Sequence, residues 1–349
     1  MIKYYTRACN FYFGSISKEK VKKKLTIPLH GNKLISFDTI EILSRKSIRR
    51  INIKKINILE NNIKKKILLD ISKISKKKKF KNLKFSNLPI LMGVLNLTPN
   101  SFSDGGRYNK KNLGVKHAKK LIKDGCGILD IGGEATNPGS KEVNQGTEWK
   151  RLFPILKKIK NFKIIISLDS RKSKIMRKGI KNKISLVNDV SGFEHDPNTI
   201  KVLKDTNIPF VIHHMQGNPS TMQKNPKYNN VVLDIYDYFE KKIKYVRSKG
   251  IKHNNIILDP GIGFGKNLKH NITLLKNISI YHSLGLPIML GTSRKRFIKN
   301  LSGVNDSKER LGGTISSSLC AIMQGVQILR VHDVNEINQS IKVFNSLKF

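Results

Sequence analysis

Short apolar runs alternate with longer segments of helical periodicity through residues 89–349, and no other feature of this sequence limits the fold as strongly. The apolar runs lie at 90–96, 128–133, 164–170, 186–191, 209–215, 255–261, 287–293 and 327–333. Near-continuous apolar runs of this length are typical of strands that are buried on both faces of a parallel sheet. The pattern therefore predicts a parallel α/β domain.

The segments that follow the apolar runs have the periodicity of helices. They lie at 111–125, 147–161, 173–181, 197–205, 232–250, 272–285, 307–325 and 335–347. Eight strand–helix pairs in succession favour a closed (β/α)8 TIM barrel over an open doubly wound sheet. We therefore predict this barrel for residues 89–349.

Residues 1–88 lack the alternation and are predicted to form a basic N-terminal extension. Amphipathic pieces such as LISFDTIEIL indicate a small α+β unit, and the Lys-rich segment 73–86 is interpreted as a linker to the barrel. The basic start of the chain also permits an organelle targeting peptide, although its helical amphipathicity is poor.

The sequence holds 67 Lys and Arg against 24 Asp and Glu, a formal net charge of +43. Clustered cations are typical of nucleic-acid binding, but here the excess runs through both parts of the chain and accompanies many Ile and Asn residues. We interpret it as a solvated surface that favours anionic substrates, and we expect no nucleic-acid partner.

No apolar run is long enough for a membrane span, and the N-terminus lacks the apolar stretch of a signal peptide. We therefore expect a cytoplasmic protein with no membrane partner. Cys9, Cys126 and Cys320 have neither disulfide-framework nor zinc-site spacing, and we interpret them as packing residues.

Polar residues lie at the carboxyl end of each predicted strand. They are Asn96, Glu134, Asp169, Asn188, Asp189, His213, His214, Asp259, Ser293, Arg294, Lys295, Arg330 and His332. One such residue is as often a strand-end cap as a functional group. In a barrel, however, all of these ends meet at the face where active sites form, so together they predict a site.

The chemistry of these residues divides around the predicted rim. The last two strands end in a hydroxyl and cationic cluster that suits phosphate, namely Ser293, Arg294, Lys295, Arg330 and His332. Asp169, Asn188 and Asp259 suit a flat, nitrogen-rich ring, because they can accept and donate at its edge. Asn96 and the loop at 97–106 could cover a pyrophosphate with its Mg2+, since this ion prefers oxygen ligands.

Nine segments in this order resemble the dihydropteroate synthase family over roughly residues 90–345. They are MGVLNLTPNSFSDGG, ILDIGGEATNPG, SLDSRK, LVNDVSG, HHMQGNPSTMQ, ILDPGIGFGKN, LGTSRKRFI, ERLGGT and LRVHDV. The resemblance implies an enzyme of folate biosynthesis, a transferase that condenses 6-hydroxymethyl-7,8-dihydropterin diphosphate with p-aminobenzoate. It also implies Mg2+ as cofactor and a homodimer.

The resemblance further implies a role for individual residues. Those expected to bind the pterin are Asp169, Asn188, Met215, Asp259, Gly291 and Lys295. Those expected at the diphosphate are Asn96, Thr136, Arg330 and His332, with Asn96 also a metal ligand. Those expected near p-aminobenzoate are Thr136, Phe264 and Ser293. Asp169, Lys295, Arg330 and His332 are the expected catalytic residues.

Two positions depart from the family pattern. Asn100 stands where the family usually has Asp, and Asn137 stands where it usually has Arg. Because an Asp–Arg pair would be lost as a unit, neither charge is left without its partner, and we expect the two asparagines to hydrogen-bond in a closed state. A folate-dependent methyltransferase barrel and a non-catalytic or altered-substrate paralogue remain alternatives.

Overall fold

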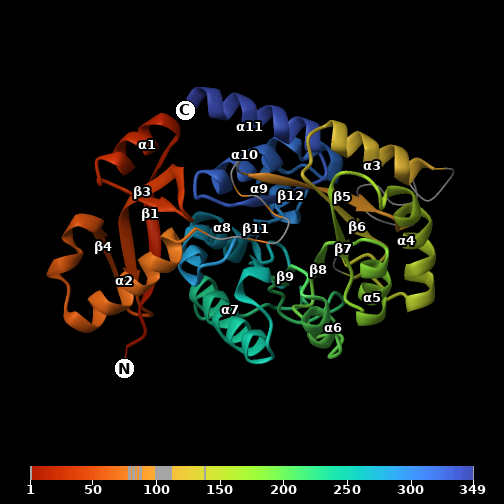
Figure 1. Ribbon diagram of the computed structural model, residues 1–349, viewed down its shortest axis with the longest axis horizontal. Coiled ribbons are helices and arrows are strands. Elements are labelled where there is room, and N and C mark those ends of the chain that lie inside the picture. The colour runs from red at the N-terminus through yellow and green to blue at the C-terminus, as the bar shows by residue number, and fades with distance from the viewer. Residues whose placement is uncertain are drawn as a thin grey trace.

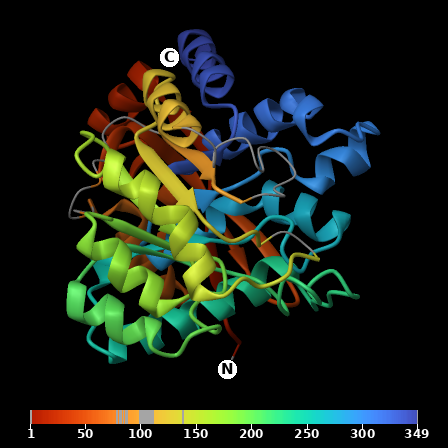
Figure 2. The same ribbon diagram turned by 90° about the vertical axis from the view of Figure 1, so that its right-hand side faces the viewer.

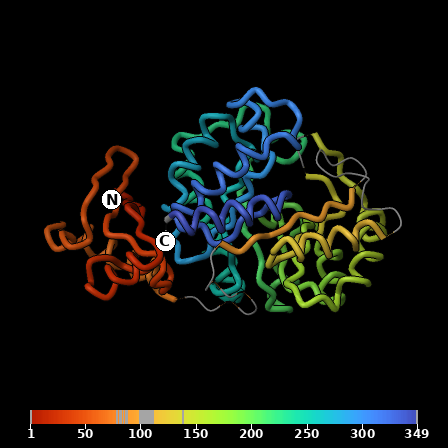
Figure 3. Tube along the Cα trace, turned by 90° about the horizontal axis from the view of Figure 1, so that it is seen from above, coloured from red at the N-terminus to blue at the C-terminus, as the bar shows by residue number. Residues whose placement is uncertain are grey.

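The computed structural model describes residues 2–77, 80, 83, 85, 89–98, 112–136 and 139–348. These residues form two units, a small N-terminal unit and a larger barrel, which lie side by side (Figure 1). The view from above shows the same arrangement, with the N-terminal unit against one flank of the barrel (Figure 3).

The barrel consists of eight parallel strands in the sheet order β10-β9-β8-β7-β6-β5-β12-β11. The strands are β5 (Ile90–Asn96), β6 (Ile128–Gly132), β7 (Ile165–Asp169), β8 (Leu186–Asp189), β9 (Phe210–His213), β10 (Ile256–Asp259), β11 (Met289–Leu290) and β12 (Ile328–Val331). A parallel bridge between Leu258 and Ile288 joins the two ends of this sheet and closes the ring. The predicted (β/α)8 barrel is confirmed.

Helices surround the strands, as the turned view shows (Figure 2). The α-helices are α3 (Leu113–Lys123), α4 (Gln145–Ile159), α5 (Ser173–Lys181), α6 (Thr199–Thr206), α7 (Val231–Ser248), α8 (Leu268–Lys276), α9 (Arg296–Ser302), α10 (Leu311–Ile322) and α11 (Val334–Lys348). The 3-10 helices in this part of the chain are η2 (His253–Asn255), η3 (Ile278–Leu284) and η4 (Ser307–Glu309).

Three helical segments differ from the sequence prediction, and one of them, 307–325, begins as η4 and becomes an α-helix only at Leu311. The segment at 272–285 is not one helix, because α8 ends at Lys276, the φ of −129° at Asn277 leaves the α region, and the chain continues as η3. The short helix α9 was not predicted. Its buried apolar residues are Phe297 and Ile298, and it ends at Ser302, where Gly303 follows with φ +76°, so its periodicity is too brief to recognise.

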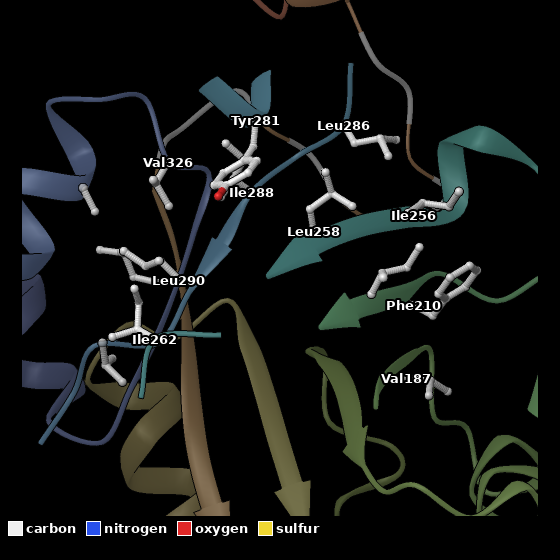
Figure 4. Close-up of a cluster of buried hydrophobic side chains, with 14 of the residues drawn as sticks. Val187, Phe210, Ile256, Leu258, Ile262, Tyr281, Leu286, Ile288, Leu290 and Val326 are labelled. Atoms are coloured by element: carbon white, nitrogen blue, oxygen red, sulfur yellow. The ribbon is translucent and has the colours of Figure 1, made fainter. Parts of the chain in front are cut away.

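Alternation along the strands separates two apolar layers. One set of side chains points outward and packs against the helices, and Figure 4 shows part of it around Phe210, Leu258 and Tyr281. The other set fills the lower interior of the barrel, with Met92, Ile128, Leu186, Val211, Ile257, Met289 and Ile328. The period of two therefore gives every strand both a helix-facing and an interior-facing side.

Phe80 and Leu83 complete the lower interior layer of the barrel. Their exposed fractions are only 6% and 5%, and the Phe80 ring lies edge-on to Phe85 at 5.2 Å between centroids. The interpretation of 73–86 as a plain linker is therefore wrong in two respects: residues 73–75 belong to helix α2, and the segment supplies apolar packing. Because this segment is rich in lysine, its isolated aromatic and leucine residues were not recognised as packing residues.

The N-terminal unit is a four-stranded antiparallel sheet flanked by helices. Its elements are β1 (Tyr5–Phe13), α1 (Gly14–Lys22), β2 (Ile27–Leu29), β3 (Asn32–Leu43), β4 (Ile48–Asn52), η1 (Ile53–Ile58) and α2 (Asn61–Ser75). It has a core of its own, which includes Phe37, Ile40, Ile67 and Ile74. No helix among the described residues has both the length and the apolar character needed to cross a membrane.

We expect Phe80→Ala to lower the free energy of unfolding by about 3 kcal/mol, because it opens a cavity beneath the interior layer. Urea denaturation followed by circular dichroism measures this change. Lys77→Ala, at an exposed position of the same segment, is the matched control and should change stability by less than about 0.5 kcal/mol. Equal stability of the two variants would contradict the packing role of Phe80.

Candidate active site

The carboxyl ends of the strands surround a cavity of ≈ 640 Å³. Its lining includes most of the site residues predicted from the sequence, namely Asn96, Thr136, Asp169, Asn188, Asp259, Phe264, Gly291, Ser293, Lys295, Arg330 and His332. These residues come from strands far apart in the chain and meet because every strand runs in the same direction.

Met215 is the exception among the residues assigned from the family resemblance, because it is not part of the cavity lining, and the strand-end residues Asp189 and His214 also lie outside it. The N–H of His214 pairs with the carbonyl of Asp259 at 2.9 Å, and beyond this bond the chain leaves the barrel rim. Met215 therefore lies half-buried in the outgoing loop.

Arg330 is held by two carboxylates at the floor of the cavity. Its Nε donates to Asp130 at 2.7 Å and its Nη2 donates to Asp169 at 2.8 Å. The amide of Asn188 donates to the same oxygen of Asp130 at 3.1 Å. Asp130 therefore orients two of the predicted site residues.

Asp130 was not predicted as a site residue. It lies in the middle of β6, is fully buried, and faces the barrel interior while its neighbours Leu129 and Ile131 face the helices. A lone acid within an otherwise apolar strand is the signal that could have identified it, because an ionised carboxylate is not buried without a partner.

Burial raises the pKa of Asp169 to about 7, because removal from water disfavours the charged form and Asp130 lies nearby. Arg330 opposes this shift. The pKa of Arg330 is itself raised by the two carboxylates despite its burial, so the guanidinium stays charged. The floor of the cavity thus combines one fixed positive charge with a carboxyl that titrates near neutrality.

Asp259 and Lys295 lie on the same side of the cavity. Asp259 accepts the N–H of Gly261 at 2.8 Å, and burial raises the pKa of its carboxyl to about 6. Burial and the charge of Arg330 lower the pKa of Lys295 to about 8. The Lys295 ammonium also lies 4.1 Å from the centroid of the Phe264 ring, a cation–π distance.

His213 is the last residue of β9, whereas His214 follows the strand and its ring lies near those of Tyr228 and Tyr238. His213 lines the cavity, and its Nδ1 donates to the carbonyl of Val190 at 3.0 Å. Burial holds the pKa of His213 well below its usual value, so the ring is neutral. Its ring lies edge-on to Phe264 at 4.6 Å between centroids.

The glycine loop, residues 261–265, carries Phe264 into the cavity. Side chains from three directions fix it: Gln223 donates to the Gly263 carbonyl at 2.6 Å, Tyr228 donates to the Gly265 carbonyl at 2.8 Å, and Asn271 accepts the Gly263 N–H at 2.7 Å. Gly265 has φ +61°, and a Cβ there would lie 2.5 Å from the Gln216 carbonyl. Only glycine fits this close approach.

Ser293 and His332 form a pair at the rim. The Ser293 hydroxyl accepts the backbone N–H of His332 at 3.2 Å and lies 2.9 Å from its Nδ1. Burial lowers the pKa of His332 well below its usual value, so the ring is neutral and Nδ1 can accept from the hydroxyl. Arg294, which sequence analysis grouped with these residues, lines the cavity but pairs with Asp333 at 3.0 Å.

A second buried ion network supports the loop that carries Thr136. Glu134 pairs with Arg171 at 3.1 Å and with Lys172 at 2.9 Å, and Lys172 also pairs with Glu148 at 2.8 Å. All four side chains are less than 10% exposed. Glu134 also accepts the N–H of Val143 at 3.1 Å, which ties the two ends of the loop together. Sequence analysis gave Arg171 and Lys172 no role.

Comparison with known proteins decides the family. A family model described as pterin binding enzyme matches residues 92–332. The dihydropteroate synthase of Escherichia coli K12 is 41% identical over 256 residues, 73% of this chain and 90% of the relative. The chain belongs to the dihydropteroate synthase family.

Solved structures of the family agree. A Yersinia pestis dihydropteroate synthase in a sulfonamide drug complex has a TM-score of 0.74 at 35% identity, over 77% of this chain and 98% of that one. A Xanthomonas albilineans dihydropteroate synthase in complex with 7,8-dihydropteroate has a TM-score of 0.68 at 31% identity, over 76% of this chain and 95% of that one. Asn100 and Asn137, the departures from the dihydropteroate synthase pattern, lie outside the described residues.

We expect Asp130→Asn to lower the free energy of unfolding by about 3 kcal/mol, because it removes one partner of a buried ion pair. Asp333→Asn breaks a pair at a partly exposed position and should cost about 1 kcal/mol or less. Urea denaturation of both variants measures the difference. Similar small losses in the two would show that Asp130 does not stabilise Arg330.

Proposed function

We propose that the protein condenses 6-hydroxymethyl-7,8-dihydropterin diphosphate with p-aminobenzoate and releases pyrophosphate. The observation that carries this proposal is the composition of one cavity, in which an amide and carboxylates lie beside cationic groups. A flat heterocycle with two linked phosphates requires this combination. Membership of the dihydropteroate synthase family supports it.

In this proposal the pterin lies against Asn188 and Asp259. The Asp259 carboxylate would accept hydrogen bonds from the aminopyrimidine edge, and Asn188 can both donate and accept. Lys295, on the same side of the cavity as Asp259, would donate to the ring, and Gly291 leaves room for its flat face. These groups would orient the ring so that its exocyclic methylene points to the cation cluster.

Arg330, His332 and Asn96 would bind the diphosphate. The side-chain oxygen of Asn96 is the protein atom that would hold Mg2+. Gly132 lies between this oxygen and Asp169, since a Cβ at Gly132 would be 3.6 Å from the Asn96 oxygen and 3.4 Å from the Cβ of Asp169. The described residues contain no group of three His, Cys, Asp or Glu suited to a metal. This donor set fits an ion held mainly by phosphate oxygens and water, and Mg2+ would neutralise charge on the leaving diphosphate.

The reaction needs no covalent bond to the protein. The bond between the methylene carbon and the diphosphate oxygen breaks, the amine nitrogen of p-aminobenzoate bonds to that carbon, and the amine loses a proton. Arg330 would stabilise the leaving charge, and ionised Asp169 would stabilise positive charge on the pterin. Phe264, Thr136 and Ser293 would surround p-aminobenzoate.

Pyrophosphate release tests this proposal. The protein is mixed with the pterin diphosphate, p-aminobenzoate and Mg2+, and pyrophosphate and dihydropteroate are quantified together. Arg330→Met should reduce the rate at least a hundredfold, because it removes charge where the leaving group departs. Pterin binding without product, in a folded wild-type protein, would instead favour a non-catalytic paralogue.

The rate should depend on pH as a bell. The value of kcat/KM for the pterin diphosphate reports groups of the free enzyme, so it should fall below about pH 7 as Asp169 gains a proton, and further below about pH 6 as Asp259 also loses its charge. It should also fall above about pH 8 as Lys295 loses its proton. Lys295→Arg keeps the positive charge at high pH, so its profile should lack the alkaline fall. An alkaline fall that persists in this variant would contradict the assignment.

We also propose a homodimer that packs through helix α10. This helix contains no charged residue, yet Gly312, Ser316, Cys320 and Met323 are exposed along one side. An uncharged exposed stripe is unusual on a chain with a net charge of +43. Exposure of Cys320 also corrects its interpretation as a packing residue, whereas Cys9 and Cys126 are buried.

Analytical ultracentrifugation should give a mass near twice 39.7 kDa for the wild type. Ser316→Glu should give monomers, because two like charges would meet across a twofold interface. Ser248→Glu, at an exposed position on α7, is the matched control and should leave the dimer intact. A monomeric wild type would refute the proposal.

A further inference from the structure

The N-terminal unit packs against η3 of the barrel through β1 and α2, and its polar side chains also reach helix α7. Three side chains of the unit contact three acids of α7. Lys3 pairs with Asp237 and Glu240, each at 2.6 Å, and Tyr5 donates to Asp237 at 2.9 Å. Arg45 pairs with Asp234 at 2.7 Å and with Asp237 at 2.8 Å. The Tyr5 ring also lies edge-on to Tyr236 at 5.1 Å between centroids. Most of this unit precedes the residues that the family model matches.

Asp234 has a second set of contacts, on the barrel side. One carboxylate oxygen accepts from Arg45, while the other accepts the backbone N–H groups of Asn229 at 2.9 Å and Asn230 at 3.1 Å. Asn230 in turn caps the start of α7 through its side chain. Arg45 therefore fixes the orientation of the carboxylate that holds residues 229–230.

Tyr228 continues this chain of contacts toward the cavity. Its hydroxyl donates to the Gly265 carbonyl at 2.8 Å, and its ring lies 4.9 Å from that of His270 between centroids. Gly265 follows Phe264, which lines the cavity between His213 and Lys295. Residues 229–230 are thus connected to the glycine loop through the side chain of the preceding residue, Tyr228.

We propose that Arg45 is a positioning residue for the p-aminobenzoate side of the site, through Asp234, residues 229–230, Tyr228 and the glycine loop. This inference rests on the proposed function, which places p-aminobenzoate against Phe264. The N-terminal unit then braces a substrate-binding loop of the barrel. The pterin side, built on strands β7, β8 and β10, meets this chain of interactions at its far end, where Gly261 donates to Asp259 and the Phe264 ring faces Lys295.

The expected effect is modest. The Arg45 side chain is 45% exposed, and exposed ion pairs contribute little individually. Arg45 nevertheless bridges the carboxylates of Asp234 and Asp237, and its loss removes one cationic partner from each of them. We expect about a threefold rise in KM for p-aminobenzoate, which corresponds to the upper range for such pairs.

Steady-state kinetics of full-length variants test the inference. Arg45→Gln should raise KM for p-aminobenzoate about threefold, with KM for the pterin diphosphate and the melting temperature nearly unchanged. Arg45→Lys keeps one charge and should restore part of the affinity. Lys46→Gln, at the next exposed position of the same turn, is the matched control and should behave as wild type. Hydrogen exchange should be faster at 229–230 and 261–265 in Arg45→Gln alone.

The outcomes separate this inference from the proposed function. An inactive wild type would refute the proposed function. An active wild type whose KM for p-aminobenzoate is the same in Arg45→Gln would overturn the positioning role. Equal rises in both KM values together with a lower melting temperature would also overturn it, because general destabilisation does not distinguish the two substrates.

Discussion

The ion cluster of Arg330 with Asp130 and Asp169 is the constraint on which the rest of the site depends. Three charged groups are removed from water here, and only close pairing offsets the cost of their burial. The three come from strands β12, β6 and β7, so the closed barrel is required to bring them together. In return the cluster fixes Asn188 and leaves Asp169 with a pKa raised to about 7.

The apolar layer beneath this cluster explains its electrostatics. Met92, Ile257 and Ile328 fill the lower interior, and Phe80 and Leu83 add to that layer. Charges in a medium of low polarizability interact strongly and shift one another's pKa values. The lowered pKa of Lys295 and the raised pKa of Asp259 follow from the same burial. A linker that seemed to be a plain solvated segment thus contributes to the environment of the site.

Helix α7 carries ion pairs between the two parts of the molecule, beside the packing of the N-terminal unit on η3. Its Asp234 and Asp237 receive the N-terminal unit, while Tyr238 donates to the carbonyl of His213 at 3.2 Å behind the cavity wall. A rigid helix that contacts both units can transmit a docking contact to a loop at the site. The chain therefore adds a unit to a dihydropteroate synthase barrel at a place where it can affect substrate binding without entering the cavity.

The sequence by itself determined the strand and helix pattern of the barrel, because near-continuous apolar runs and a period of 3.6 are local properties of the chain. It also placed polar residues such as Asp259 and Arg330 at strand ends, which parallel strands bring to one face. Only the tertiary structure decided their partners. Asp130 pairs with Arg330, Glu134 with Lys172, and Arg45 with Asp234, and the partners in each pair are distant in sequence. The local pattern around these residues indicates only packing or solvation. Local periodicity carries no information about which distant charge will neutralise a buried one, since that depends on how the barrel closes and where the N-terminal unit docks.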